Sequence, residues 1–189
     1  MPRQKVDESF IILQSLKLFR QQSYYNTSMA DIAKSCGLQK GSLYHYFPSK
    51  EELMKRVIQT VHQYFKERVF AHAYNKNQSP SERMKAMLES MERVFLDEAS
   101  ASLMGNIGVE SALMIPEFAG LIKQFFTDFF HAVKTIYADK YSETVANELA
   151  ERSVAEIEGS LMFARVFNDH SFLLHSTKRI LLRLEKNGN

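Results

Sequence analysis

Apolar residues recur every three or four positions along most of this chain of 189 residues. The clearest run forms one continuous stripe: Phe118, Ile122, Phe125, Phe129, Val133 and Ile136. Such spacing lies along one face of an α-helix, whereas no segment alternates strictly as a half-buried β-strand would. Seven Gly and four Pro are also too few for an all-β chain, which turns about every ten residues. We therefore predict an all-α protein.

Capping residues and breaks divide the chain into about nine expected helices. With their caps they span residues 6–22, 28–37, 40–47, 49–74, 80–98, 101–114, 116–139, 142–167 and 170–185. In the first helix we expect a buried stripe of Phe10, Leu13, Leu16 and Phe19. The fourth helix is expected to carry the chain out of an N-terminal module, and the polar segment 75–79 is the clearest linker.

The charge of the chain is uneven. Residues 1–50 carry seven Lys or Arg against three Asp or Glu, a net charge of +4, whereas the remaining 139 residues carry 17 against 19. This asymmetry favours a basic N-terminal module that meets a polyanion, although solvated helical faces carry similar excesses.

The stretch TSMADIAKSCGLQKGSLYHYF, residues 27–47, has the pattern of a helix-turn-helix. Ala33 allows a second helix to cross closely, and Gly37 suits a tight turn after the first. Leu38 and Leu43, together with Tyr46 or Phe47, supply the apolar side that docks the second helix. Eight residues form a rod about 12 Å long, comparable with the major groove of B-DNA.

The opposite side of that short helix has residues suited to DNA: Lys40, Gly41, Ser42, Tyr44 and His45. Lysine reaches phosphates or guanine acceptors, glycine allows close approach, and serine, tyrosine and histidine donate to phosphates or base edges. Taken singly, each has an ordinary structural interpretation, since lysines are usually solvated and tyrosines half-buried. Their combination on one helix favours DNA binding.

Two further helix starts favour phosphate contacts. Thr27 and Ser28 begin the second helix and Lys50 begins the fourth, where exposed amides and the helix dipole attract anions. The alternative for Ser28 is a purely structural cap, because Asp31 completes a capping box with it.

The segment YYNTSMADIAKSCGLQKGSLYHYFPSKEELMKRVI, residues 24–58, resembles the DNA-binding domain of the TetR family of transcriptional regulators. The resemblance implies a helix-turn-helix DNA-binding domain in residues 1–50 and a helical ligand-binding and dimerisation domain in 51–189. It implies a repressor released from a palindromic DNA operator by a small apolar or aromatic ligand. The implied DNA contacts are Thr27, Ser28, Lys40, Gly41, Ser42, Tyr44, His45 and Lys50. Gln39 departs from the usual Ser or Thr cap, so it either caps less well or contacts DNA.

The ligand pocket is expected among the fifth to eighth helices, where methionines and rings make adaptable walls. The candidates are Met87, Met91, Phe95, Met104, Ile107, Glu110, Phe118, Phe125, Phe129 and Phe163, with Asn106, His131 and Arg165 as further polar groups. For any one apolar residue, ordinary core packing is the alternative. Broad apolar faces on the last two helices favour a homodimer, which the resemblance places there as a four-helix interface.

Other classes of protein fit the sequence less well. Neither a phosphate-binding glycine loop, a metal-ligand cluster nor a nucleophile pattern is present, so we expect no enzyme, cofactor or metal. The single Cys36 and the lack of a leader or long apolar run favour a cytoplasmic protein without a membrane span. A ligand-independent DNA-binding or architectural protein is the main alternative. A helical lipid carrier would not need the face of residues 40–45.

Overall fold

The computed structural model describes residues 6–96, 104–105 and 116–185, and within these residues all regular structure is helical. The elements are α1 (Glu8–Gln22), α2 (Met29–Ser35), α3 (Lys40–Tyr46), α4 (Lys50–Arg68), the 3₁₀-helix η1 (Phe70–Tyr74), α5 (Pro80–Leu96), α7 (Pro116–Ala138), α8 (Glu143–Phe167) and α9 (Ser171–Glu185). The all-α prediction is confirmed. The helix expected over 101–114 lies outside the described residues except for 104–105, which are helical.

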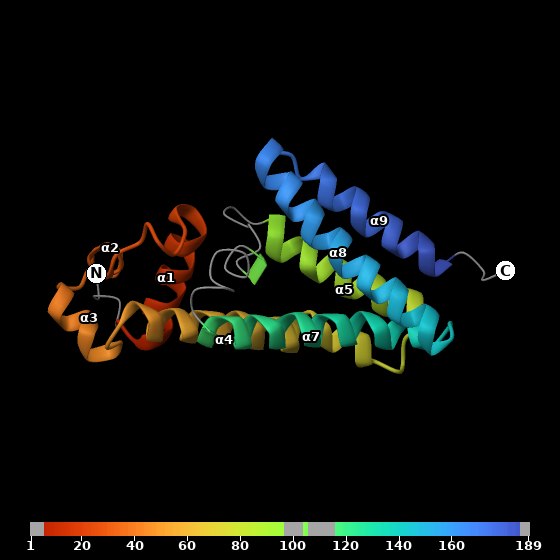
Figure 1. The fold of residues 1–189 in the computed structure, drawn as a ribbon, viewed down its shortest axis with the longest axis horizontal. Helices are drawn as coiled ribbons and strands as arrows, with labels where there is room; N and C mark the ends of the chain where they lie inside the picture. Colours follow the sequence, from red (N-terminus) through yellow and green to blue (C-terminus); the bar gives the residue numbers. More distant parts are fainter. Residues whose placement is uncertain (1–5, 97–103, 106–115, 186–189) are drawn as a thin grey trace.

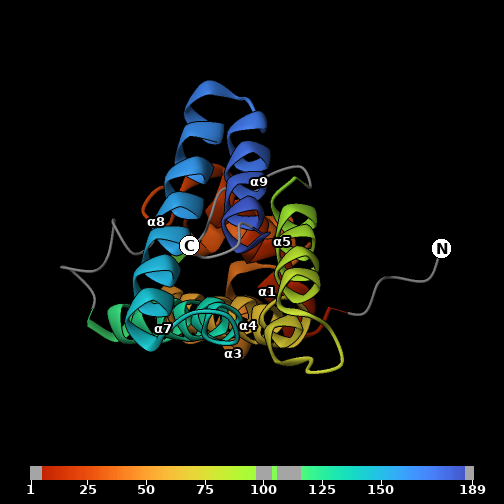
Figure 2. The same ribbon diagram turned by 90° about the vertical axis from the view of Figure 1, so that its right-hand side faces the viewer.

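The helices form an N-terminal group and a body that are joined by α4 (Figure 1). Helices α1, α2 and α3 gather at one end of the molecule, and α4 runs from there alongside α7. Helices α5, α8 and α9 lie on one side of the α4–α7 pair, and α8 and α9 pack against each other (Figure 2). Because α4 begins at Lys50, the expected domain boundary after residue 50 falls in its first turn.

Helix α1 follows the predicted stripe only in part, since Phe19 is buried and Phe10 and Leu16 are partly buried against the core. Its buried residues are Ile11, Ile12, Ser15 and Phe19, whereas Leu13 is 51% exposed. The reason is geometric, because residues spaced strictly by three drift around a helix with 3.6 residues per turn. The buried set instead stays on the side that packs against α4 and α2.

Helix α4 is shorter than predicted. It ends at Arg68, and the following 3₁₀-helix η1 inserts Phe70 and Ala73 into the core. The Phe70 ring stacks on Phe129 of α7, with 5.4 Å between centroids and 13° between planes. A straight continuation of α4 was the wrong prediction, since burial of Phe70 against α7 favours a turn at this point.

The centre of the body is a cluster of phenylalanine rings that joins α4, η1, α5 and α7. Phe65 lies 5.2 Å from Phe125, 5.7 Å from Phe70 and 5.8 Å from Phe95, measured between ring centroids. Such tilted and edge-on contacts add to the free energy gained by burying the rings. The cluster therefore fixes the C-terminal half of α4 to the body.

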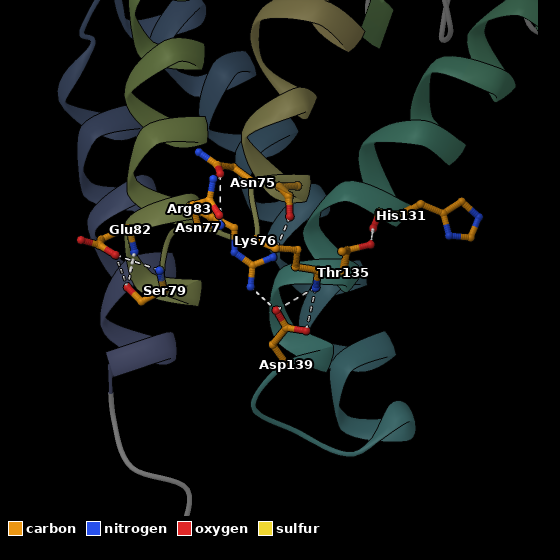
Figure 3. A network of polar contacts seen from close by, with 10 residues as sticks. Asn75, Lys76, Asn77, Ser79, Glu82, Arg83, His131, Thr135 and Asp139 are labelled. Atoms are coloured by element: carbon orange, nitrogen blue, oxygen red, sulfur yellow. Dashed lines mark hydrogen bonds and ion pairs between the residues drawn. The ribbon is translucent and has the colours of Figure 1, made fainter.

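A polar network holds the loop between η1 and α5 at the far end of the body (Figure 3). Arg83 is 1% exposed and donates to the Ala73 carbonyl at 2.8 Å and to the Asp139 carboxylate. Lys76 donates to the same carboxylate at 3.1 Å. Hydrogen bonding from Arg83 contributes most to lowering the pKa of Asp139. This network ties η1 and α5 to the end of α7.

Candidate nucleic-acid interface

The turn between α2 and α3 is closed by a Schellman motif. The Leu38 amide donates to the Ala33 carbonyl at 2.8 Å, and the Gly37 amide donates to the Lys34 carbonyl at 3.1 Å. Gly37 has φ +67°, in the left-handed region that glycine adopts without a steric penalty. These contacts set the direction in which α3 leaves α2.

Helix α3 has one buried and one exposed side, as the helix-turn-helix pattern requires. Leu43 is fully buried, and Phe47, which follows the helix, is 4% exposed. The residues expected to face DNA lie on the other side: Lys40, Gly41, Tyr44 and His45 are exposed and Ser42 is partly buried. The aromatic ring of Tyr46 is also exposed, and its hydroxyl donates to the Val6 carbonyl at 3.3 Å.

Gly41 has no role in packing within the described residues. A Cβ atom built there meets no heavy atom within 4 Å, and its backbone is not in the left-handed region. A glycine in a helix costs stability relative to alanine. The absence of a side chain at Gly41 therefore leaves space on the exposed side of α3 for the close approach of a binding partner.

The two residues at the start of α2 have different surroundings. Ser28 is exposed, and its Oγ accepts from the Asp31 amide at 3.2 Å and donates to the Asp31 carboxylate at 2.6 Å. Thr27 is 1% exposed, and its hydroxyl donates to the Ser23 carbonyl at 2.7 Å. Thr27 thus fixes the loop, while Ser28 keeps an accessible hydroxyl at the surface.

Lys50, at the start of α4, is bonded to that same loop. Its ammonium donates to the carbonyls of Tyr24 and Thr27, both at 3.0 Å, and lies 4.3 Å from the Tyr24 ring centroid. The Tyr24 hydroxyl donates to Glu51 at 3.1 Å. Burial, and then the Glu51 carboxylate, raises the pKa of Tyr24 well above its usual value. An ammonium group has three donors, so Lys50 retains one beyond these two bonds.

Gln39 is the N-cap of α3, but its side chain makes no capping hydrogen bond and is exposed. The first turn of α3 contains no acidic residue, and Lys34 and Lys40 are both exposed beside it. The amide of Gln39 is thus available at the edge of the exposed face of α3.

Most of the expected pocket residues are packed in the core of the body. Those with side chains 0–6% exposed are Met87, Met91, Phe95, Met104, Phe118, Phe125 and Phe129. Phe163 is 44% exposed and contacts Phe167 and Phe172 where α8 ends and α9 begins, away from this group. Ile107, Glu110 and Asn106 lie outside the described residues.

An open cleft of about 730 Å³ lies elsewhere, between α1, α4, η1 and α5. We call it the arginine cleft, and its lining is Leu13, Leu16, Arg20, Thr60, Val61, Tyr64, Phe65, Glu67, Arg68, His72, Ser90, Arg93 and Val94. The sequence did not predict this cleft, because its walls come from four separate elements. In the sequence, the cleft was indicated only by the pair Leu13 and Leu16, which we had predicted to lie in the buried stripe of the first helix.

Within residues 6–96, 104–105 and 116–185, no helix is both long and apolar enough to span a membrane. The same residues contain no group of three His, Cys, Asp or Glu side chains that could hold a metal ion. Cys36 is buried, and burial raises the pKa of its thiol.

Comparison with known proteins supports the interpretation of the N-terminal group as a helix-turn-helix domain. The sequence profile of the bacterial regulatory proteins of the tetR family matches residues 11–57. The HTH-type transcriptional regulator LmrA of Bacillus subtilis is 24% identical over 173 residues, which cover 87% of this chain and 89% of LmrA. The uncharacterized HTH-type transcriptional regulator YuxN of the same organism is 40% identical over 79 residues. That match covers 40% of this chain but only 26% of YuxN.

The fold is also that of a solved structure, a TetR transcriptional regulator from Legionella pneumophila. The two superpose with a TM-score of 0.83 at 22% identity, and the match covers 93% of this chain and 96% of the other. At this identity the likeness concerns the fold, and it extends over both the N-terminal group and the body.

Proposed function

The chain belongs to the TetR family of bacterial transcriptional regulators, and we propose that it is a repressor released from a palindromic DNA operator by a small apolar or aromatic ligand. The observation that carries this proposal is the exposed side of α3, where Lys40, Tyr44 and His45 are exposed and a Cβ added to Gly41 would contact none of the described residues. We further propose residues 1–50 as the DNA-binding domain and 51–189 as the ligand-binding and dimerisation domain.

In this proposal α3 enters the major groove. Its seven residues are about 10 Å long, which fits a groove about 12 Å wide. Lys40 then reaches phosphates or guanine, and Gly41 brings the backbone close to the DNA. Tyr44 and His45 donate from the next turn, and the free amide of Gln39 lies within reach of the same groove.

Residues around α3 are proposed to hold the DNA backbone. Lys50 lies at the start of a 19-residue helix, where the dipole and its remaining donor both favour a phosphate. The accessible hydroxyl of Ser28 is a second contact. Thr27 is buried, so its contribution is to fix the loop and to offer backbone groups rather than its hydroxyl.

The dimer is proposed to form through α8 and α9. Large apolar side chains are exposed along these helices: Met162 at 58%, Phe163 at 44%, Val166 at 71%, Phe167 at 59% and Leu174 at 43%. A patch of this kind on a monomer is typical of an interaction surface, and a two-fold axis pairs it with its own copy. The two α3 helices would then contact half-sites about 34–36 Å apart, one turn of DNA.

Release by a ligand requires two arrangements of the dimer with different affinities for it. Helix α4 is the element suited to this, because it begins at Lys50 and is held in the body by the ring cluster around Phe65. A ligand that tilts α4 would change the spacing of the two α3 helices and lower the affinity for the operator.

A ligand-independent DNA-binding protein is a second candidate, favoured by the close packing of Met87, Met91 and Phe118. Measuring the affinity of the protein for its operator with and without a candidate ligand distinguishes the two proposed functions. An affinity that stays constant at proven ligand occupancy favours this second candidate.

The experiment that tests DNA binding is selection of duplexes from a random library, followed by affinity measurements at fixed salt. We expect an enriched palindrome, and Lys40→Ala and Tyr44→Ala should each weaken binding about tenfold without altering dimer mass. Lys85→Ala on the exposed face of α5 is the matched control. Unchanged binding by both α3 variants would reject the proposed interface.

A further inference from the structure

We infer that the arginine cleft binds an amphipathic organic anion, a molecule with one carboxylate and an apolar body. Its volume of about 730 Å³ is in the range of small-molecule sites. The cleft is separate from the packed group around Met87, Met91 and Phe118. Its chemistry is set by apolar lining side chains and by arginines from three helices.

The charges of the lining favour an anion. Arg20 of α1, Arg68 of α4 and Arg93 of α5 border the same cleft, and among its described lining residues Glu67 is the one carboxylate. The Glu67 carboxylate accepts from Gln63 at 2.5 Å. Among the ion pairs of the described residues, none involves Arg68 or Arg93, although Arg93 donates to the Ser90 hydroxyl at 2.9 Å. A guanidinium group binds a carboxylate through two parallel hydrogen bonds.

The apolar walls favour a hydrocarbon body beside that carboxylate. Leu13 and Tyr64 line the cleft and are 51% and 49% exposed, and Leu16 and Val94 in the same lining are partly buried. An inorganic anion would leave these side chains uncovered. A purely apolar ligand would remove water from the Arg68 and Arg93 guanidinium groups without bringing them a carboxylate, which costs free energy. Only a ligand with both a carboxylate and an apolar body matches both the arginines and the apolar side chains of the cleft.

The position of the cleft gives such a ligand a route to the DNA-binding residues. Leu13, Leu16 and Arg20 belong to the N-terminal group, whereas Ser90, Arg93 and Val94 belong to α5 in the body. A ligand held by both sides fixes the angle between them. This regulatory role rests on the proposed function, whereas binding of the anion does not.

Calorimetric titration of the full chain with decanoate tests the site, with decanol and decyltrimethylammonium as matched neutral and cationic probes. We expect decanoate to bind at least about tenfold more tightly than either. The double variant Arg68→Gln/Arg93→Gln should lower decanoate affinity by about tenfold or more. Arg56→Gln, an exposed arginine on α4 outside the cleft, should leave it unchanged. Val94→Trp fills the cleft without altering charge and should weaken all three probes.

Equal binding of the three probes, or full decanoate affinity in the double variant, would overturn the assignment. Retained binding by Val94→Trp would also overturn it, because the ligand would then lie elsewhere, such as on the exposed apolar patch of α8 and α9. Operator affinity is measured separately without decanoate. Intact operator binding with no decanoate binding rejects the cleft alone. Decanoate binding that leaves operator affinity unchanged rejects only its regulatory role.

Discussion

Replacement of Gly41 by alanine separates the stability of α3 from its proposed contact with DNA. An added Cβ meets no heavy atom of the described residues within 4 Å, and the backbone of Gly41 is already that of an ordinary helix. Alanine is favoured over glycine by about 1 kcal/mol within a helix, and by about half of that near its first turn. Gly41→Ala should therefore raise the unfolding free energy by about 0.5 kcal/mol and the melting temperature by about 1–2 °C.

The same methyl group should weaken operator binding. If α3 lies in the major groove with Gly41 against the DNA, the new methyl forces the helix away from the bases. Overpacking of a close interface costs about 1–3 kcal/mol, which corresponds to roughly 5- to 150-fold weaker binding. Fluorescence anisotropy with a labelled selected operator at fixed salt measures this loss, and thermal unfolding of the same preparation measures the stability.

Two other glycines provide matched controls. Gly120 on α7 also has no neighbour among the residues that the structure describes within 4 Å of an added Cβ, so Gly120→Ala should raise stability without altering operator affinity. Gly37 has φ +67°, so Gly37→Ala should instead lower stability by about 1 kcal/mol. Operator binding by Gly41→Ala as tight as by the original chain would refute the reasoning. A loss of stability in that variant would show that the space beside Gly41 is filled.

Three further predictions concern charge and association. Asp139→Asn should lower the unfolding free energy by about 2 kcal/mol in urea titrations at neutral pH, because Arg83 is buried and loses its charged acceptor. The folded-state pKa of Asp139 lies below its usual 3.8, so the stability that its carboxylate contributes is full above that value and is lost as pH falls through the folded pKa. Asp139→Asn should therefore flatten the fall of the unfolding free energy below about pH 4. An identical pH dependence in the variant would contradict this. Phe167→Glu should give monomers in sedimentation velocity, whereas Tyr74→Glu, at a similarly exposed aromatic residue, should remain dimeric. Lys40→Ala should reduce the slope of log affinity against log salt concentration by about one, as expected for the loss of one phosphate contact. An unchanged slope would place Lys40 away from the DNA backbone.

The helix-turn-helix could be predicted from the sequence because its determinants are local. Ser28 and Asp31 form the expected capping box, Gly37 makes the expected turn, and Leu43 is buried while Tyr44 is exposed. Each of these depends on residues within a few positions of one another. A single sequence therefore contains the information needed to place the exposed side of α3.

The body was less predictable because its arrangement depends on contacts between distant segments. The end of α4 at Arg68 follows from the packing of Phe70 on Phe129, which are far apart in the chain. Phe163 had the composition of a pocket wall, yet it lies on the surface because α8 and α9 leave that end uncovered. Apolar character alone does not distinguish core, pocket and interface.

The loop before α2 links the proposed DNA contacts to the body. Tyr24 lies in this loop, and its ring is 5.4 Å from Phe118 near the start of α7, while its hydroxyl donates to Glu51 of α4. Lys50 holds the carbonyls of Tyr24 and Thr27, so the loop is bonded to the first turn of α4. A tilt of α4 relative to α7 must therefore either break these hydrogen bonds or move the start of α2 with it. Since breaking bonds to a charged group costs about 1.5–3 kcal/mol each, the loop should follow α4, and α3 should move as part of the same unit.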